Sequence, residues 1–120
     1  MIKSDKKYQQ AKECPITLFM NEIGGKWKPV ILWLLQLHEV MRFNELNRAI
    51  HGISQKMLSQ QLKDLERLQL IDRKSYHVIP PKVEYSLTPK GASLTPILQE
   101  ILDWTNQNLI ENTGEPCTRK

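Results

Sequence analysis

The sequence contains 120 residues with a mass of 14.0 kDa, which is the length of a single domain with one hydrophobic core. Its composition of 40% hydrophobic and 25% charged residues is that of an ordinary globular protein, so disorder is excluded for most of the chain. The longest apolar run is far shorter than the roughly 20 residues of a membrane helix, and the first ten residues are too polar for a signal peptide. We therefore expect a cytoplasmic protein.

The formal net charge of +4 is distributed unevenly along the chain. Residues 42–90 contain nine Lys or Arg and five Asp or Glu, whereas residues 91–120 contain two and four. Positive charge gathered in the middle of a small domain favours an anionic partner, for which nucleic acid and acidic lipid are the main candidates.

The N-terminal third predicts an arm followed by two helices. Residues 1–13 are polar and lysine-rich, and we expect a flexible arm there, with a short extension helix as the alternative. Cys14 and Pro15 suit the N-cap and first position of a helix. Its apolar stripe falls at helical spacing and ends at two glycines. The stripe consists of Ile16, Phe19, Met20 and Ile23. Residues 28–37 are apolar almost all round and predict a buried helix, although the run 30–35 is also compatible with a buried strand.

The central third predicts a helix-turn-helix. Phe43, Leu46 and Ile50 mark a short helix that ends near Gly52, a residue able to adopt the positive φ of a tight turn. Ser54 is expected to cap a further helix over residues 55 to about 68. In that helix leucines gather on one face, and amide, hydroxyl and cationic side chains gather on the other.

The last third predicts a hairpin and a terminal helix. Residues 71–76 and 83–87 have strand character, and a double proline marks the hairpin tip between them. Thr88 and Pro89 predict the start of a last helix that can restart at Pro96. Its apolar face is too broad for one small domain to cover, so it requires a partner surface. We expect one domain over residues 14–110 and a mobile tail over 111–120.

The predicted order of elements is that of a winged helix-turn-helix, an α+β fold that is mainly α with a small β-hairpin wing and flanking dimerisation helices. Five stretches resemble HxlR-type transcriptional regulators in order and spacing: residues 23–27 (IGGKW), 42–46 (RFNEL), 52–54 (GIS), 58–62 (LSQQL) and 80–88 (PPKVEYSLT). The resemblance covers residues 14–104. It implies a dimeric bacterial DNA-binding regulator whose terminal helices form the dimer. Many members of the family respond to oxidants or electrophiles through an N-terminal cysteine.

Residues 55–67 meet the requirements of a recognition helix independently of the resemblance. The helix has an apolar back, and its front carries Gln and Lys side chains that can bond to adenine and guanine edges. The candidate DNA-binding residues of this helix and its cap are Ser54, Gln55, Lys56, Ser59, Gln60 and Lys63. Arg42 and Lys82 are further candidates for phosphate contacts, and His77 for a minor-groove contact. The alternative for each of these three residues is a solvated surface position.

Cys14 is the predicted redox-sensing residue. A helix N-terminus stabilises a thiolate, and Lys6, Lys7 and Lys12 lie on the same arm, although Glu13 opposes them. The alternative is an inert structural cysteine. Cys117 lies in the predicted tail, where it could resolve an oxidised Cys14 across a dimer. Neither cysteine belongs to a cluster with zinc-ligand spacing, so we expect no metal and no cofactor.

These patterns predict a sequence-specific DNA-binding regulator that is not an enzyme. They contain no Ser/His/Asp set, phosphate-binding glycine loop or paired carboxylates. We expect a homodimer on an inverted repeat of double-stranded DNA, with no membrane partner and with an oxidant or electrophile as signal. The alternatives are control by a non-covalent small ligand and a protein-interaction module without a thiol switch. The predicted dimer contacts are Ile16, Phe19, Leu98, Ile101 and Trp104.

Overall fold

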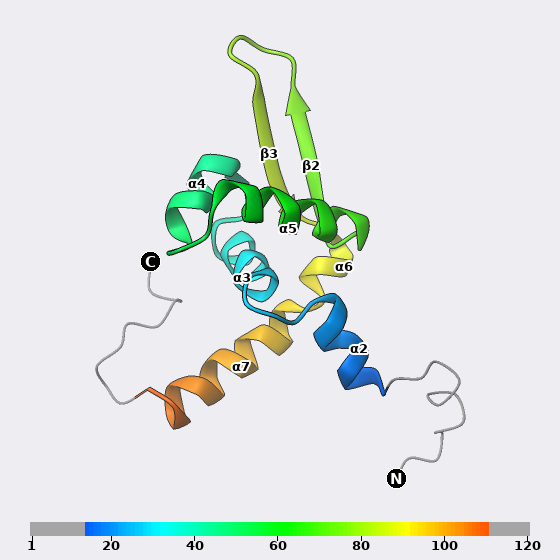
Figure 1. The fold of residues 1–120 in the computed structure, drawn as a ribbon, viewed down its shortest axis with the longest axis vertical. Coiled ribbons are helices and arrows are strands. Elements are labelled where there is room, and N and C mark those ends of the chain that lie inside the picture. The colour runs from blue at the N-terminus through cyan, green and yellow to red at the C-terminus, as the bar shows by residue number, and fades with distance from the viewer. Residues whose placement is uncertain (1–13, 111–120) are drawn as a thin grey trace.

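The computed structural model describes residues 14–110, and Figure 1 shows its elements. The predicted flexible arm (1–13) and mobile tail (111–120), with Cys117, lie outside the described residues. In chain order the elements are α2 (Pro15–Glu22), α3 (Lys28–His38), β1 (Met41–Arg42), α4 (Phe43–Ala49), α5 (Gln55–Arg67), β2 (Ile71–Tyr76), β3 (Lys82–Leu87), α6 (Pro89–Ala92) and α7 (Thr95–Asn108). This order confirms the predicted winged helix-turn-helix and its α+β class.

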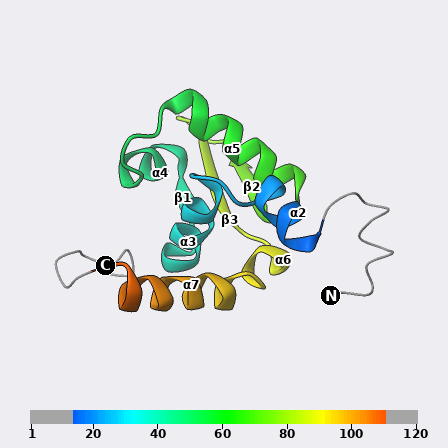
Figure 2. The same ribbon diagram turned by 60° about the horizontal axis from the view of Figure 1, so that its bottom comes forward.

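The helix α3 is the centre of the domain and lies between α5 and α7 (Figure 2). Residues 30–35 are helical, so the alternative of a buried strand is wrong. The helical period explains why Ile31, Leu32 and Leu35 are buried whereas Val30, in the same apolar run, is exposed. The preceding helix α2 begins after Cys14 with Pro15 in its first turn, as predicted.

The helix-turn-helix consists of α4 and α5. The backbone N–H of Arg42 donates to the Glu45 carboxylate at 2.8 Å, which fixes the first turn of α4. Gly52 has φ of 87° in the turn, as its position predicts. The Ser54 hydroxyl accepts from the Met57 N–H at 3.0 Å and caps α5.

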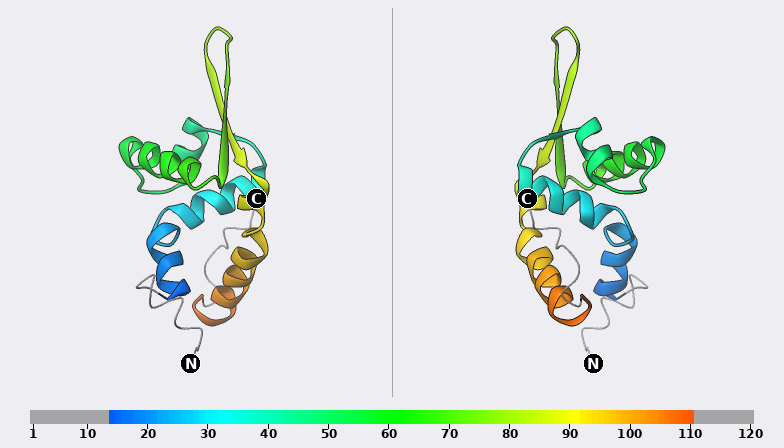
Figure 3. Two further views of the ribbon diagram at one scale, coloured as in Figure 1. Left: turned by 90° about the vertical axis from the view of Figure 1, so that its right-hand side faces the viewer. Right: turned by 90° about the vertical axis from the view of Figure 1, so that its left-hand side faces the viewer.

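The sheet has three antiparallel strands in the order β1-β3-β2. The sequence did not reveal β1, because two residues are too short to show alternation. Met41 pairs with Tyr85 in β1 and β3, and both side chains are buried. Strand β3 begins at Lys82, one residue earlier than predicted. The β2–β3 hairpin forms the wing and projects well beyond the body (Figures 1 and 3).

The last helix is divided in two. The Thr88 hydroxyl accepts from the Gly91 N–H and donates to the Gln69 carbonyl, so α6 is capped and held against the end of α5. A Cβ at Gly91 would collide with the Leu70 carbonyl oxygen, which explains the glycine at this close approach. The chain then restarts as α7 with Pro96 in the first turn, confirming the predicted restart. Figure 1 shows α2 and α7 at the end of the molecule opposite the wing.

Candidate functional site

The outer face of α5 carries the polar residues expected of a recognition helix. Gln55, Lys56, Gln60 and Lys63 are exposed, and Ser59 is half-buried. The opposite face places Leu58, Leu62 and Leu65 in the core, each at most 1% exposed. Because the leucines fix the rotation of the helix about its axis, the amide and ammonium groups point to solvent.

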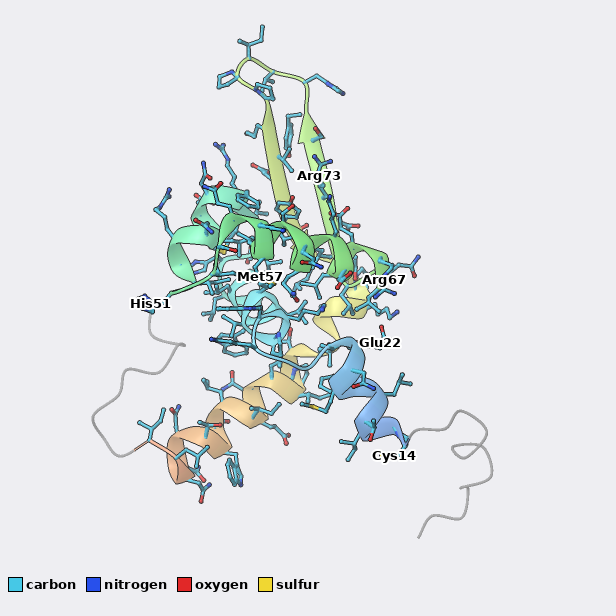
Figure 4. All side chains as sticks on the ribbon, in the orientation of Figure 1. Cys14, Glu22, His51, Met57, Arg67 and Arg73 are labelled. Atoms are coloured by element: carbon cyan, nitrogen blue, oxygen red, sulfur yellow. The ribbon has the colours of Figure 1, made fainter. Side chains whose placement is uncertain are left out.

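Two ion pairs at the C-terminal half of α5 connect it to the preceding helices. The Asp64 carboxylate lies 3.3 Å from the Lys28 ammonium at the start of α3. The Arg67 guanidinium lies 3.5 Å from the Glu22 carboxylate at the end of α2, and Figure 4 labels both residues. Lys28 has a side chain only 12% exposed, so solvent screens its pair less than it screens the pair of Arg67. These contacts orient α5 relative to α2 and α3.

The wing presents two different faces because side chains alternate along its strands. Arg73 pairs with Tyr85 across the ladder, and Tyr85 is buried in the core. Arg73 therefore shares the face of the sheet that packs toward the body, and Figure 4 shows it at the base of the wing beside α5. Lys74 pairs with Glu84 and lies on the other face.

Lys82 is already engaged within the wing. Its ammonium lies 3.6 Å from the Glu84 carboxylate and 4.7 Å from the centre of the Tyr76 ring. The Tyr76 hydroxyl also donates to Glu84 at 3.1 Å. Arg42 is exposed on β1, and the residue opposite it in the β1–β3 backbone ladder is the same Glu84. A phosphate contact by Lys82 stays a prediction, and it has to compete with Glu84 for the ammonium.

Arg73 is the candidate that the sequence reasoning missed. It is exposed on β2 near the base of the wing, whereas Lys82 pairs with Tyr76 farther along the hairpin and His77 follows the end of β2. The signal was present in the adjacent cations Arg73 and Lys74, because alternation in a strand must place one of them on the side of α5. The surface formed by the outer face of α5 and Arg73 is called the reading surface below. Arg42, whose ladder partner is Glu84, shares the other face of the sheet with Lys74.

Cys14 lies apart from the reading surface, at the far end of α2 in Figure 4. Its Sγ atom is exposed and lies 3.3 Å from the Thr17 hydroxyl. The hydrogen bond with this hydroxyl, followed by those from the backbone N–H groups of Thr17 and Ile16, lowers the pKa of the Cys14 thiol below its ordinary value. These donors belong to the first turn of α2, where the orphan amides of a helix N-terminus favour a thiolate.

Large apolar side chains are exposed on both α2 and α7, and together they are called the uncovered apolar surface below. Ile16 is 73% exposed, Ile101 52% and Trp104 58%. A groove of about 420 Å³ separates α3 from α7. Most of its walls are apolar, formed by Pro29, Val30, Trp33, Leu34, Ala49, Leu98, Ile101, Leu102 and Ile110, with Thr105 and Asn106 as the polar residues. Of the predicted dimer contacts, Leu98 is buried in its own chain and Phe19 is half-buried.

Within residues 14–110, no three His, Cys, Asp or Glu side chains are grouped so that they could hold a metal ion. None of the helices between these residues is long and apolar enough to cross a membrane.

Comparison with known proteins gives consistent matches. The HxlR-like helix-turn-helix family model matches residues 22–113. An HTH-type transcriptional regulator of Halalkalibacterium halodurans is 48% identical over 104 residues, covering 85% of this chain and 92% of that protein. The oxidised form of the redox regulator HypR superposes with a TM-score of 0.75 at 40% identity, covering 82% of this chain and 100% of the other. Diamide-treated YodB from Bacillus subtilis gives a TM-score of 0.65 at 34% identity, covering 82% and 97%.

The thiol of Cys14 should ionise at lower pH than an ordinary cysteine. Because the thiolate is the nucleophile, the midpoint of its alkylation rate against pH should lie below that of a free thiol. Thr17→Val removes the first of the stabilising hydrogen bonds and should raise the midpoint, whereas Thr17→Ser keeps the hydroxyl and should not. Iodoacetamide kinetics in a Cys117→Ser background measure this. Equal midpoints for the two Thr17 variants would contradict the assigned cause.

Proposed function

Because the chain belongs to the HxlR-like helix-turn-helix family, we propose that it binds an inverted-repeat operator as a homodimer and responds to oxidants or electrophiles through Cys14. Like the members of its family and its relatives, it is a DNA-binding transcriptional regulator, and it is not an enzyme. The observation that carries the proposal is the reading surface, where a capped helix with an exposed amide and cationic face lies beside Arg73.

The reading surface fits the major groove of double-stranded DNA. The side chains of Gln55 and Gln60 can bond to adenine edges, and Lys56 and Lys63 can donate to guanine. Arg42 on β1 and Arg73 on β2 are exposed on the two outer strands of the sheet and can supply positive charge for phosphates. In a symmetric dimer two such surfaces read half-sites separated by about one helical turn, roughly 34 Å, or a multiple of it.

Substitutions of the base-facing and of the phosphate-facing residues should have different consequences. Gln60→Ala and Lys56→Ala should weaken operator binding by about 1 to 3 kcal/mol and relax base preference, because they remove base contacts. Arg42→Ala and Arg73→Ala should weaken operator and scrambled DNA alike and reduce the salt dependence. Lys82→Ala should act in the same way with a smaller loss, because Glu84 already shares its charge. Binding isotherms on both DNAs at several salt concentrations measure this. If Gln60→Ala weakens both DNAs equally, Gln60 does not read bases.

The uncovered apolar surface of α2 and α7 supports the homodimer. A soluble monomer rarely leaves several large apolar side chains exposed at one end of the molecule, and a two-fold pair covers both copies of such a surface at once. The groove between α3 and α7 is continuous with this surface through Ile101. We therefore assign a second copy of the chain as its occupant.

The chain should sediment as a dimer at micromolar concentration. Ile101→Asp should weaken the dimer by about 3 to 5 kcal/mol, because it places an unpaired charge in the interface. Val40→Asp is the matched control, since Val40 is similarly exposed but belongs to the segment between α3 and β1 and does not line the groove, so the substitution should leave the dimer intact. A wild-type monomer would contradict the proposal. A dimer that persists in Ile101→Asp would leave the groove free for a small apolar ligand instead.

The position of Cys14 favours control through the dimer rather than direct obstruction of DNA. The thiol lies far from the reading surface but on the uncovered apolar surface, two residues from Ile16. A modification there would alter the packing of the two copies and hence the separation of the two recognition helices. A coupling of about 1 to 3 kcal/mol changes affinity roughly 5- to 150-fold, so a small shift suffices. The similar protein HypR is a redox regulator, which supports this proposal.

Oxidants should change the DNA affinity of this chain through Cys14. Operator binding by the wild type should differ before and after treatment with diamide, hypochlorite or a quinone, whereas Cys14→Ser should not respond. Cys117→Ser is the control for the other thiol and should respond like the wild type unless Cys117 resolves the oxidised Cys14. A full response from Cys14→Ser would show that the signal enters elsewhere.

A further inference from the structure

The tip of the wing carries an apolar side chain that nothing in the described chain covers. Ile79 is 100% exposed, the highest value among the large hydrophobic residues between positions 14 and 110. Its neighbour Val78 is 49% exposed, and two prolines follow. Hairpin tips usually consist of polar residues, glycine and proline, so the fold itself does not require an isoleucine at this position.

The charges around the tip indicate which kind of partner covers it. From Arg73 to Val83 the sequence contains Arg73, Lys74, His77 and Lys82 but no carboxylate. The nearest acidic residue, Glu84, is paired with Lys82 and accepts from Tyr76. A fully exposed apolar residue on a cationic hairpin fits a polyanion with an apolar interior, and the stacked bases of DNA are such an interior.

The wing has the length needed to reach a second groove. Each of its strands has six residues, which corresponds to about 20 Å at the usual rise per residue. The major and minor grooves of B-DNA follow each other at half a helical turn, or about 17 Å. With α5 in the major groove, the tip therefore reaches the neighbouring minor groove. Figures 1 and 3 show the hairpin projecting beyond α5 by a large part of its length.

We propose that Ile79 is an apolar wedge that enters the minor groove and partly unstacks one base step. This inference rests on the DNA binding proposed above and adds a mode of recognition to it. The adjacent Pro80 and Pro81 restrict the backbone at the tip, so little conformational entropy is lost when the side chain inserts. Pyrimidine–purine steps unstack most easily, so the wedge selects such a step without a hydrogen bond to it.

The test uses the duplex that the wild-type protein selects from a random-sequence pool, with 2-aminopurine placed at each step of the flanking minor grooves. Fluorescence should rise at one step in each half-site when the wild type binds. Ile79→Leu should retain the rise, and Ile79→Ser should lose it while still binding the duplex. Val40→Ser, which removes an exposed apolar side chain outside the wing, is the matched control and should behave like the wild type.

A second measurement separates unstacking from affinity. Replacing the pyrimidine–purine step by a stiff A-tract step should weaken wild-type binding about tenfold and should affect Ile79→Ser much less. The wedge proposal is wrong if Ile79→Ser raises the fluorescence as much as the wild type does. It is also wrong if the wild type and Ile79→Ser lose the same factor in affinity on the stiff step. Neither result would contradict DNA binding itself. A wild type that binds no duplex from the pool would overturn both the wedge and the proposed function.

Discussion

The burial of one face of α5 is the contact on which the rest of the structure depends. Leu58, Leu62 and Leu65 lose nearly all of their accessible surface against the core, and full burial of each such side chain contributes about 1.5 to 3 kcal/mol. Because these leucines must face the core, the rotation of α5 about its own axis is fixed. The same leucines that hold the helix to the domain turn its glutamines and lysines outward.

Ionic contacts refine the placement that the leucines make. The pair between Lys28 and Asp64 connects the first residue of α3 to the helix that carries the reading surface. The pair between Arg67 and Glu22 connects α5 to α2, the helix that Cys14 directly precedes. Both pairs are partly exposed and contribute little to stability. Their importance is geometric, because they relate the reading surface to α2, the helix that the proposed switch would move.

The molecule is divided into two ends with different surfaces. The wing and α5 form a cationic end that has hydrogen-bonding side chains and one uncovered isoleucine, whereas α2 and α7 form an apolar end. The single helix α3 lies between α5 and α7 and has residues in the core and in the groove wall. An influence of one end on the other can pass through α3, through the Arg67–Glu22 ion pair between α5 and α2, or through a change in how two copies are arranged.

The sequence by itself determined the helix-turn-helix, the capping of α5 by Ser54, the hairpin and the break near Pro96. Each of these depends on local chemistry: helical spacing of leucines, a hydroxyl at an N-cap, or prolines that cannot donate a hydrogen bond. It did not reveal β1, which exists only because Met41 and Arg42 pair with β3, more than forty positions later in the chain. It also did not reveal Arg73, or that Lys82 is paired with Glu84. Whether a cation of the wing is free or paired depends on the strand register and on which face of the sheet the core covers. Only the tertiary structure decides the register and the covered face, because both are set by residues that are distant in sequence.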